Sequence, residues 1–290
     1  KISVYLLWHR LQYTKKVFLM TMLEIYCMSL YNSTYEVIKN LGYIPVGLKN
    51  NDFSKEWLRD NTLKNISDKN PYYGEYTFYY WYWKNILNLE DKNKWVGFCS
   101  YREYWGNKKK IKSTNLKDLV LQQPHEDWKN YDTIIGEPIF VGGTKIIKML
   151  KYGKMALFRN PKAIFSSKGK TIRWQFDMFH GAGTLDKAID LLPNKDRDDF
   201  RTFTRNENAF ARGNMFISRS PQIIDLYFRE VFDWLFKCEK IFGFNLEGYG
   251  KIRMYTFLAE RFLPFWFKKY SNYLEWPVIY YDIDKINEKI

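Results

Sequence analysis

The chain has 290 residues, a formal net charge of +14 and a pI of about 9.4. Hydrophobic residues make up 46% of it and charged residues 27%, which is typical of a globular protein and excludes an intrinsically disordered one. The three cysteines, Cys27, Cys99 and Cys238, form no CxxC or Cys/His pattern. The sequence therefore favours reduced thiols in a cytoplasmic protein over a disulfide scaffold or a zinc module.

The positive charge favours an anionic partner, such as a phosphorylated ligand, acidic lipid headgroups or nucleic acid. The lysines are scattered and no nucleic-acid-binding motif is present, so we expect no specific nucleic acid partner. Charge alone leaves a solvated basic surface and a membrane-facing patch equally open. The most apolar run, residues 17–30, is interrupted by Glu24 and Ser29 and is too short to span a bilayer.

The first elements of the chain predict an α/β fold. Residues 2–7 are predicted to form a buried strand that ends at residues 8–10, and a helical region is predicted from there to Asn40. A second strand is predicted over residues 43–47, at a sheet edge or just beginning, because Pro45 cannot donate a hydrogen bond to a neighbouring strand. A strand, a helix and a strand are the opening of a fold with a parallel sheet.

Residues 60–105 are the most distinctive stretch. A polar segment rich in Asn and Asp precedes an aromatic helix that begins after Asn70-Pro71. A short apolar strand at residues 95–99 then leads into Ser-Tyr-Arg-Glu-Tyr at residues 100–104. A core helix would normally prefer Leu, Ile and Ala, so the density of Tyr and Trp indicates a cleft with one wet side. An aromatic-rich core is the alternative.

The remaining chain alternates helices and strands, with more helix towards the carboxyl terminus. We place a division between two halves after the strand at 131–136. The predicted elements are a helix at 116–121, that strand, broken helical patterns over 145–193, a strand at 215–218, a helix from Ser220-Pro221 to about residue 240, a helix at 249–262 and a strand at 278–281.

The polar cluster behind the strand at 95–99 is the most informative for chemistry. Ligands of open α/β sheets bind beyond the carboxyl ends of the strands, so Arg102 could clamp a phosphate there while Tyr101 and Tyr104 stack on a base or a sugar. A surface loop with an ion pair is the alternative. The sequence contains no P-loop, dinucleotide-binding, HExxH or GxSxG motif, which disfavours the common motif-bearing enzyme classes.

Four other polar residues stay open between a ligand contact and a structural role. Asp60, Asn61 and Asn65 either contact a ligand or form Asx turns and caps. His180, which stands before a glycine, is either a site residue or a buried, hydrogen-bonded histidine.

Four blocks of sequence, in order, carry a resemblance to a known family. They are DNTLKNISDKNPYYGEYTFYYWYWKN (60–85), WVGFCSYREYW (95–105), GNMFISRSPQIIDLYFREVFDWLFKCEK (213–240) and YTFLAERFL (255–263). Together they resemble a bacterial glycosyltransferase family catalogued as domain of unknown function 4422, which is found in capsule, exopolysaccharide and lipopolysaccharide gene clusters. Residues 1–10 are similar, more loosely, to that family's opening strand.

The resemblance implies a single GT-A-like α/β domain with a mainly parallel central sheet flanked by helices and a helix-rich carboxyl-terminal half. Residues 1–136 would bind the nucleotide-sugar and residues 137–290 would shape the acceptor site. The implied reaction moves a hexose, such as galactose or galactofuranose, from a UDP-sugar to a lipid-linked or polysaccharide acceptor in surface glycan biosynthesis. The implied site residues are His9, Arg10, Asp60, Asn61, Asn65, Tyr101 and Tyr104 for the donor, and His180, Glu207, Asn214 and Glu260 for the acceptor or sugar.

An inverting transferase needs a carboxylate to deprotonate the acceptor hydroxyl. Glu75, Glu103, Glu207 and Glu260 are candidates that the sequence does not rank. We place Glu75 and Glu103 in the catalytic group, together with Arg102, which would neutralise the diphosphate leaving group.

The metal requirement is open in the sequence. Many GT-A enzymes carry an Asp-x-Asp motif after this strand and this chain has none, so the reaction is either metal-independent or uses Mg²⁺ or Mn²⁺ held by Glu103. The chain also departs from the family's pattern at Ser100, Glu103, Leu63-Lys64 and Gly74, where the family has His, Arg, Gly-Asp and Cys.

Two further expectations concern partners. The aromatic and basic segment at residues 262–276 would suit peripheral contact with anionic lipid on the inner face of the plasma membrane. The alternative function is a non-catalytic glycan- or nucleic-acid-binding protein, in which charge and aromatic rings give affinity and the altered blocks give no turnover.

Overall fold

The structure is a computed structural model that describes residues 22–49, 52–91, 93–108, 113–142, 154–161, 163, 166 and 169–281. Its strands are β1 (Met22–Ser29), β2 (Ile44–Gly47), β3 (Leu58–Arg59), β4 (Lys94–Ser100), β5 (Glu103–Trp105), β6 (Thr133–Gly136), β7 (Pro138–Phe140), β8 (Ala209–Ala211), β9 (Phe216–Ser218), β10 (Tyr273–Trp276) and β11 (Val278–Tyr280).

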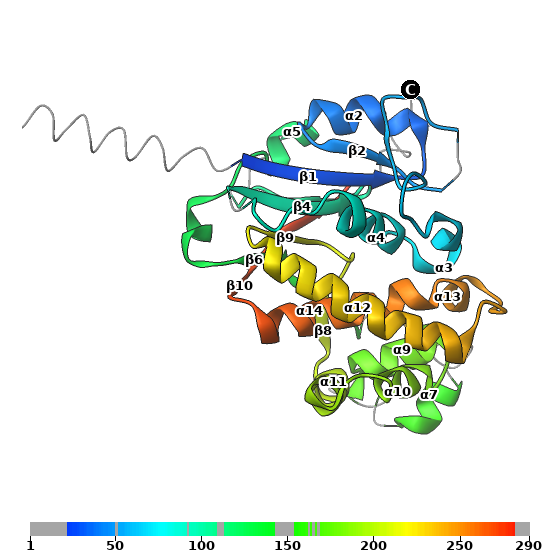
Figure 1. Ribbon diagram of the computed structural model, residues 1–290. Coiled ribbons are helices and arrows are strands. Elements are labelled where there is room, and N and C mark those ends of the chain that lie inside the picture. Colours follow the sequence, from blue (N-terminus) through cyan, green and yellow to red (C-terminus); the bar gives the residue numbers. More distant parts are fainter. Residues whose placement is uncertain are drawn as a thin grey trace, which may run out of the picture.

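The helices lie on both sides of a central sheet (Figure 1). The α-helices are α2 (Tyr35–Asn40), α3 (Asn70–Tyr73), α4 (Tyr76–Asn85), α5 (Leu116–Leu119), α7 (Lys154–Arg159), α9 (Ile172–His180), α10 (Thr184–Ile189), α11 (Asn194–Asn206), α12 (Pro221–Phe242), α13 (Tyr249–Ile252) and α14 (Met254–Tyr270). Three short 3₁₀ helices, η1 (Asn32–Thr34), η2 (Ser67–Lys69) and η3 (Glu126–Asn130), complete the described elements.

The central sheet is mainly parallel, as the sequence predicts. Its strand order is β10–β6–β9–β4–β1–β2–β3, and a β5–β11 pair joins it at the end of β4. β1 pairs in parallel with β2 and β4, β2 with β3, and β6 with β10. β9 runs antiparallel between β4 and β6. Since β9 and β10 come from the second half of the chain, both halves build one sheet.

The opening of the chain differs from the prediction. The helical region predicted up to Asn40 contains the strand β1, which lies between β2 and β4, and only Tyr35–Asn40 is α-helical after the short η1 turn. A strand that is buried on both faces is a continuous apolar run, which periodicity alone cannot distinguish from a buried helix. The strand predicted at residues 2–7 lies outside the described residues.

Two apolar layers hold the sheet. On one face, alternate residues such as Tyr26 and Phe98 pack against α4, α12 and α14. On the other face, Ile25 and Cys27 pack with residues of α2 and α5. The long helix α12 begins as predicted, because the Ser220 hydroxyl accepts a hydrogen bond from the Ile223 amide at 3.3 Å and Pro221 follows at the first helical position.

The aromatic helix is a core element, so the prediction of a wet aromatic cleft along it is wrong. Gly74 divides it into α3 and α4, and the rings of Tyr76, Phe78 and Tyr79 are fully buried. Their hydroxyl groups are satisfied inside: Tyr76 shares a 2.5 Å hydrogen bond with Tyr227, and Tyr79 donates to the Asn214 carbonyl. The aromatic-rich core, which was the alternative, is what these side chains form.

The segment predicted to contact lipid is also interior. Residues 262–270 belong to α14, and its side chains Leu263, Phe265, Trp266 and Phe267 are buried against α12 and the sheet. Tyr273–Trp276 then forms β10 inside the sheet. Within the described ranges, no helix is both long and apolar enough to cross a membrane.

Candidate functional site

β1 and β4 end side by side at the edge of the sheet where the predicted cluster begins. The Tyr101 amide donates to the Met28 carbonyl at 3.0 Å. The ring centroids of Tyr31 and Tyr101 lie 5.3 Å apart, and the Arg102 guanidinium carbon lies 4.9 Å from the centre of the Tyr101 ring. Two rings and a cation therefore stand just beyond the carboxyl ends of two central strands, where ligands of such sheets bind.

Glu103, the first residue of β5, has an unusual carboxyl group. Burial, followed by repulsion from Glu260 and Glu75, raises the pKa of Glu103 to about 7, although the charge of Arg212 acts in the opposite direction. Near neutral pH this carboxyl group is therefore divided between its protonated and ionised forms. A group in that condition can both accept and return a proton.

Gly213 brings two of these carboxylates together. Its amide donates to Glu260 Oε1 at 3.1 Å. Its backbone has φ +93°, and a Cβ atom at this position would lie only 2.3 Å from Glu103 Oε2. The missing side chain leaves room for Glu103, so a glycine is required here both for conformation and for space.

Glu75 belongs to the same cluster through α14. Thr256 donates from its hydroxyl to Glu75 Oε2 at 3.1 Å, and Arg253 Nη2 lies 3.6 Å from the same oxygen. Asn214 donates from Nδ2 to the Thr256 hydroxyl at 3.0 Å. Asn214 Oδ1 is buried and accepts no hydrogen bond from the described residues. Hydrogen bonds thus connect Glu75 and Asn214, which are far apart in the sequence.

Arg261 and His180 form a buried polar group that holds Glu260 in place. Arg261 is buried and pairs with Glu260 Oε2, while its Nη2 donates to Gln175 Oε1 at 2.6 Å. His180 Nδ1 lies 2.7 Å from the Gly250 carbonyl and Nε2 lies 3.3 Å from Arg261 Nη2. Burial and the Arg261 charge lower the pKa of His180 to about 3. The imidazole is therefore neutral near pH 7, and these contacts assign its proton to Nδ1.

Asp60 directly follows β3 and contacts α4 through Thr77. It is fully buried, and its Oδ2 accepts a 2.5 Å hydrogen bond from Thr77. Asn70 donates to the same Thr77 hydroxyl at 3.0 Å and to the Gly74 carbonyl at 2.9 Å. Burial raises the pKa of Asp60 to about 6. This polar group joins the loop after β3 to the turn that carries Glu75.

The other predicted site residues lie in different surroundings. Asn65 shapes its own loop, since Oδ1 accepts from the Ser67 amide at 3.1 Å and Nδ2 donates to the Leu63 carbonyl at 2.9 Å. Tyr104 is fully buried, with its hydroxyl bonded to the Tyr101 carbonyl at 2.8 Å. Asn61 is partly exposed. Glu207, which directly follows α11, is exposed. His9 and Arg10 lie outside the described residues.

Sequence reasoning missed the cations of the cluster. They are Arg212, Arg253 and Arg261, and only the last lies in a block that resembles the family. A signal was present at two positions, since Arg212 directly precedes the Gly-Asn pair of the third block and Arg261 follows Glu260.

The described residues include no group of three or more His, Cys, Asp or Glu side chains that could hold a metal ion. Glu103 and Glu260 supply hard oxygen atoms, but the charges of Arg212 and Arg261 beside them oppose the binding of a further cation.

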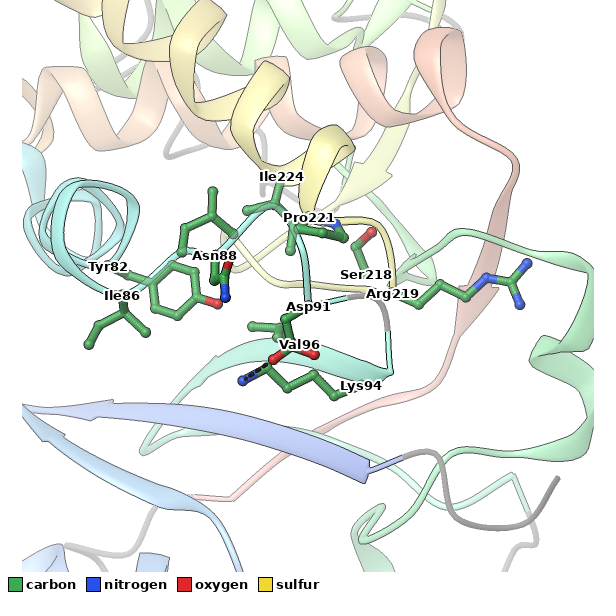
Figure 2. Close-up of a pocket in the computed structure, with 11 residues that line it drawn as sticks. Tyr82, Ile86, Asn88, Asp91, Lys94, Val96, Ser218, Arg219, Pro221 and Ile224 are labelled. Atoms are coloured by element: carbon green, nitrogen blue, oxygen red, sulfur yellow. Dashed lines mark ion pairs between the residues drawn. The ribbon is translucent and has the colours of Figure 1, made fainter. Parts of the chain in front are cut away.

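A separate hollow lies at the opposite, amino end of β4 (Figure 2). It is lined by the end of α4 and the start of α12, and its cations are already paired. Lys94 lies 2.8 Å from Glu24 and 3.1 Å from Asp91, and Arg219 lies 3.3 Å from Asp132. This hollow therefore offers less to an anionic ligand than the carboxyl edge does.

The fold and this edge define an α/β protein with a mainly parallel sheet and a charged cluster beyond β4. Residues 25–272 match the family described as "Domain of unknown function (DUF4422)", and the chain belongs to that family. The match begins inside β1 and does not include residues 1–10, which the sequence compared with the family's opening strand. No curated protein matches the chain.

One solved structure is similar in fold. It is described as the apo structure of the WbbM bifunctional glycosyltransferase, with a TM-score of 0.64 and 18% sequence identity. The alignment covers 89% of this chain and 45% of that one, so the chain spans less than half the length of this relative.

Proposed function

We propose that the chain is a glycosyltransferase that moves a hexose from a UDP-sugar to a lipid-linked or polysaccharide acceptor in surface glycan biosynthesis, with galactose or galactofuranose as the first sugars to test. The observation that carries this proposal is Glu103, a carboxyl group with a pKa of about 7 that is surrounded by paired charges at the carboxyl edge of the sheet. The antiparallel β9 between β4 and β6, and the likeness to a glycosyltransferase structure, support a GT-A-like fold.

The donor would bind where β1 and β4 end. Tyr31, which is 43% exposed, offers its ring to the base with the buried Tyr101 ring packed against it, and Arg102 offers a guanidinium group to the diphosphate. Asn61 lies in the loop after β3, two strands away from β1 in the sheet, and would reach ribose or sugar hydroxyl groups. Asp60, Asn65 and Tyr104 would act indirectly, by holding this loop and the turn after β4 in place.

Glu103 would be the general base. In a single displacement, the acceptor hydroxyl oxygen forms the new bond to the anomeric carbon as the bond to the diphosphate oxygen breaks. The hydroxyl proton passes to Glu103, and Arg102 neutralises the charge of the departing UDP. Glu75 ranks lower as a base, because Thr256 and Arg253 already contact its Oε2.

Residues of the second half would complete the acceptor side. Glu260 raises the pKa of Glu103 and is held by Arg261, which His180 contacts in turn. The orphan Oδ1 of Asn214 would accept a hydrogen bond from a sugar hydroxyl once the side chain is uncovered. Because Arg212 and Arg261 already place positive charge beside these carboxyl groups, no step is routed through a metal ion.

A donor-binding assay tests the assignment of Arg102. We expect the purified chain to bind at least one UDP-sugar in calorimetry, and Arg102→Ala to weaken that binding at least about tenfold, because a charge-assisted contact to the diphosphate is lost. Arg229→Ala is the control, since Arg229 is 63% exposed on α12. Equal affinities of the wild type and Arg102→Ala would remove Arg102 from the donor site, and tight, salt-sensitive binding to nucleic acid would favour the non-catalytic alternative.

Gly213 offers a test of how Glu103 is positioned. Gly213→Ala places a Cβ atom 2.3 Å from Glu103 Oε2, so the carboxylate must move and turnover should fall by about 10²-fold. Gly243→Ala is a matched control, because φ is +61° there and nothing lies within 4 Å of the added atom. Both variants carry a similar backbone strain of about 1–3 kcal/mol. If they lose turnover equally, Gly213 does not position the base.

A further inference from the structure

The corner between β8 and β9 has a fixed backbone beside the carboxylate cluster. Gly213 and Asn214 both have a positive φ, +93° and +51°. The corner is held at two points, since the Gly213 amide donates to Glu260 Oε1 at 3.1 Å and the Asn214 carbonyl accepts from the Tyr79 hydroxyl. A residue other than glycine is uncommon in the left-handed region and persists there where the surrounding contacts hold it. Arg212, the residue before this corner, therefore starts from a fixed position at the edge of the cluster.

Arg212 is exposed, unlike the other two arginines of the cluster. Arg261 is buried and paired with Glu260, and Arg253 is partly buried beside Glu75. The Arg212 guanidinium group forms no hydrogen bond or ion pair with any residue in the part of the chain that the structure describes. This includes Glu137, the described and exposed residue before β7. The five N–H donors of Arg212 are therefore available to an anionic ligand.

The cluster has a surplus of positive charge when Glu103 holds a proton. The charged groups around Glu103 are three arginines and two further carboxylates, namely Arg212, Arg253, Arg261, Glu75 and Glu260. With Glu103 protonated, three positive charges face two negative ones, and Arg212 is the exposed cation among them. A ligand that brings one negative charge to Arg212 neutralises this surplus, whereas a neutral ligand leaves it in place.

We propose that Arg212 binds a carboxylate or phosphate group of the acceptor, and so selects an acidic saccharide, or a saccharide attached to a phosphate, over a neutral one. This deepens the proposed function and rests on it, because the ligand beside Glu103 is the acceptor only if Glu103 is the base. A guanidinium group suits either anion, since it can donate two parallel hydrogen bonds to both. The bound anion would also stabilise the protonated form of Glu103, because a nearby negative charge disfavours a second one. Anion binding at Arg212 and proton uptake by Glu103 therefore favour each other.

Ligand titrations followed by NMR, with excess UDP present to occupy the donor site, test the proposal. The probes are methyl β-D-glucuronide for an acidic sugar, α-D-glucose 1-phosphate for a sugar phosphate, and methyl β-D-glucoside as the neutral reference. At least one of the two anions should bind at least about tenfold more tightly than the neutral glucoside. Arg212→Gln should remove this preference and Arg212→Lys should restore part of it. Arg229→Gln is the matched control, because it removes one positive charge from an arginine that is 63% exposed on α12.

The pH dependence of binding tests whether the anion lies beside Glu103. Relative to its affinity for Glu103→Gln, the affinity of the anion for the wild type should fall as pH rises through about 7, because Glu103 loses its proton there and then repels the anion. His180 stays neutral over this range, since its pKa is about 3. Thermal unfolding of each variant checks that the fold is retained.

Three results would overturn the proposal: no preference of the wild type for either anion, a preference that survives in Arg212→Gln, or an anion affinity whose pH dependence is the same in the wild type and in Glu103→Gln. The proposed reaction is tested separately, because the release of UDP from a UDP-hexose with water requires no anionic acceptor. A chain that releases UDP but shows no preference for anions contradicts only the role of Arg212. A chain that binds anions through Arg212 but cleaves no nucleotide-sugar contradicts only the transferase reaction.

Discussion

Replacing Glu103 by glutamine is expected to lower kcat by about 10²–10⁴-fold, the range that a general base contributes. The amide keeps the size of the side chain but cannot accept the proton of the acceptor hydroxyl. In the wild type, kcat/KM should rise with pH through about 7, because the carboxyl group must be ionised to act and its pKa lies there. The variant should lose this inflection.

The stability of the same variant provides an internal control. The folded-state pKa of Glu103 is raised, so its contribution to stability is present below the ordinary carboxyl pKa and is lost as pH rises through about 7. Glu103→Gln should therefore be more stable than the wild type at pH 8, by on the order of 2 kcal/mol, and the gain should vanish towards pH 4. Glu36→Gln, at an exposed position of α2, should change neither quantity. Full turnover in Glu103→Gln would exclude Glu103 as the base.

Replacing Arg261 by alanine is expected to cost about 3–5 kcal/mol of the free energy of unfolding, the range for removing one partner of a buried ion pair. Glu260 would be left without its cation in a partly buried position, and Gln175 would lose the donor to its Oε1. The Phe257 carbonyl would lose a 3.1 Å hydrogen bond as well.

Denaturant unfolding with a matched surface variant checks this result. Arg229→Ala breaks an exposed pair with Asp225 four residues away on α12, and should cost no more than about 0.5 kcal/mol. If the free energy of unfolding of Arg261→Ala lies within about 1 kcal/mol of the wild-type value, the pair with Glu260 does not stabilise the fold as a buried ion pair.

The part of the fold that the sequence predicted rests on strong local patterns. The apolar run at 95–99, the capped start of α12 and the strand at 215–218 each appear where they were expected, as β4, α12 and β9. β1 was missed because an apolar run buried on both faces carries no period that separates a strand from a helix. The helix α14 was expected to end near residue 262 but continues past Pro264 to Tyr270, because its aromatic side chains are buried on α12.

The candidate site was harder to predict than the fold. Tyr101, Arg102 and Glu103 were identified because they follow a strand, which is a local rule. The approach of Glu75, Glu103 and Glu260 to one another depends on three segments that only the tertiary fold brings together, so no spacing in the sequence could rank them. The tyrosines of α4 led to the wrong prediction of a wet cleft. In the sequence, a tyrosine whose hydroxyl group is hydrogen-bonded inside a core cannot be distinguished from one that binds a ligand.

The release of UDP from a panel of UDP-hexoses tests the central claim most directly. With water or a saccharide acceptor, the purified chain should release UDP from at least one of them. Arg102→Ala and Glu103→Gln should release it far more slowly, and Glu36→Gln should match the wild type. If the chain neither binds nor hydrolyses any UDP-, GDP- or CMP-sugar, the cluster around Glu103 is not a glycosyltransferase site.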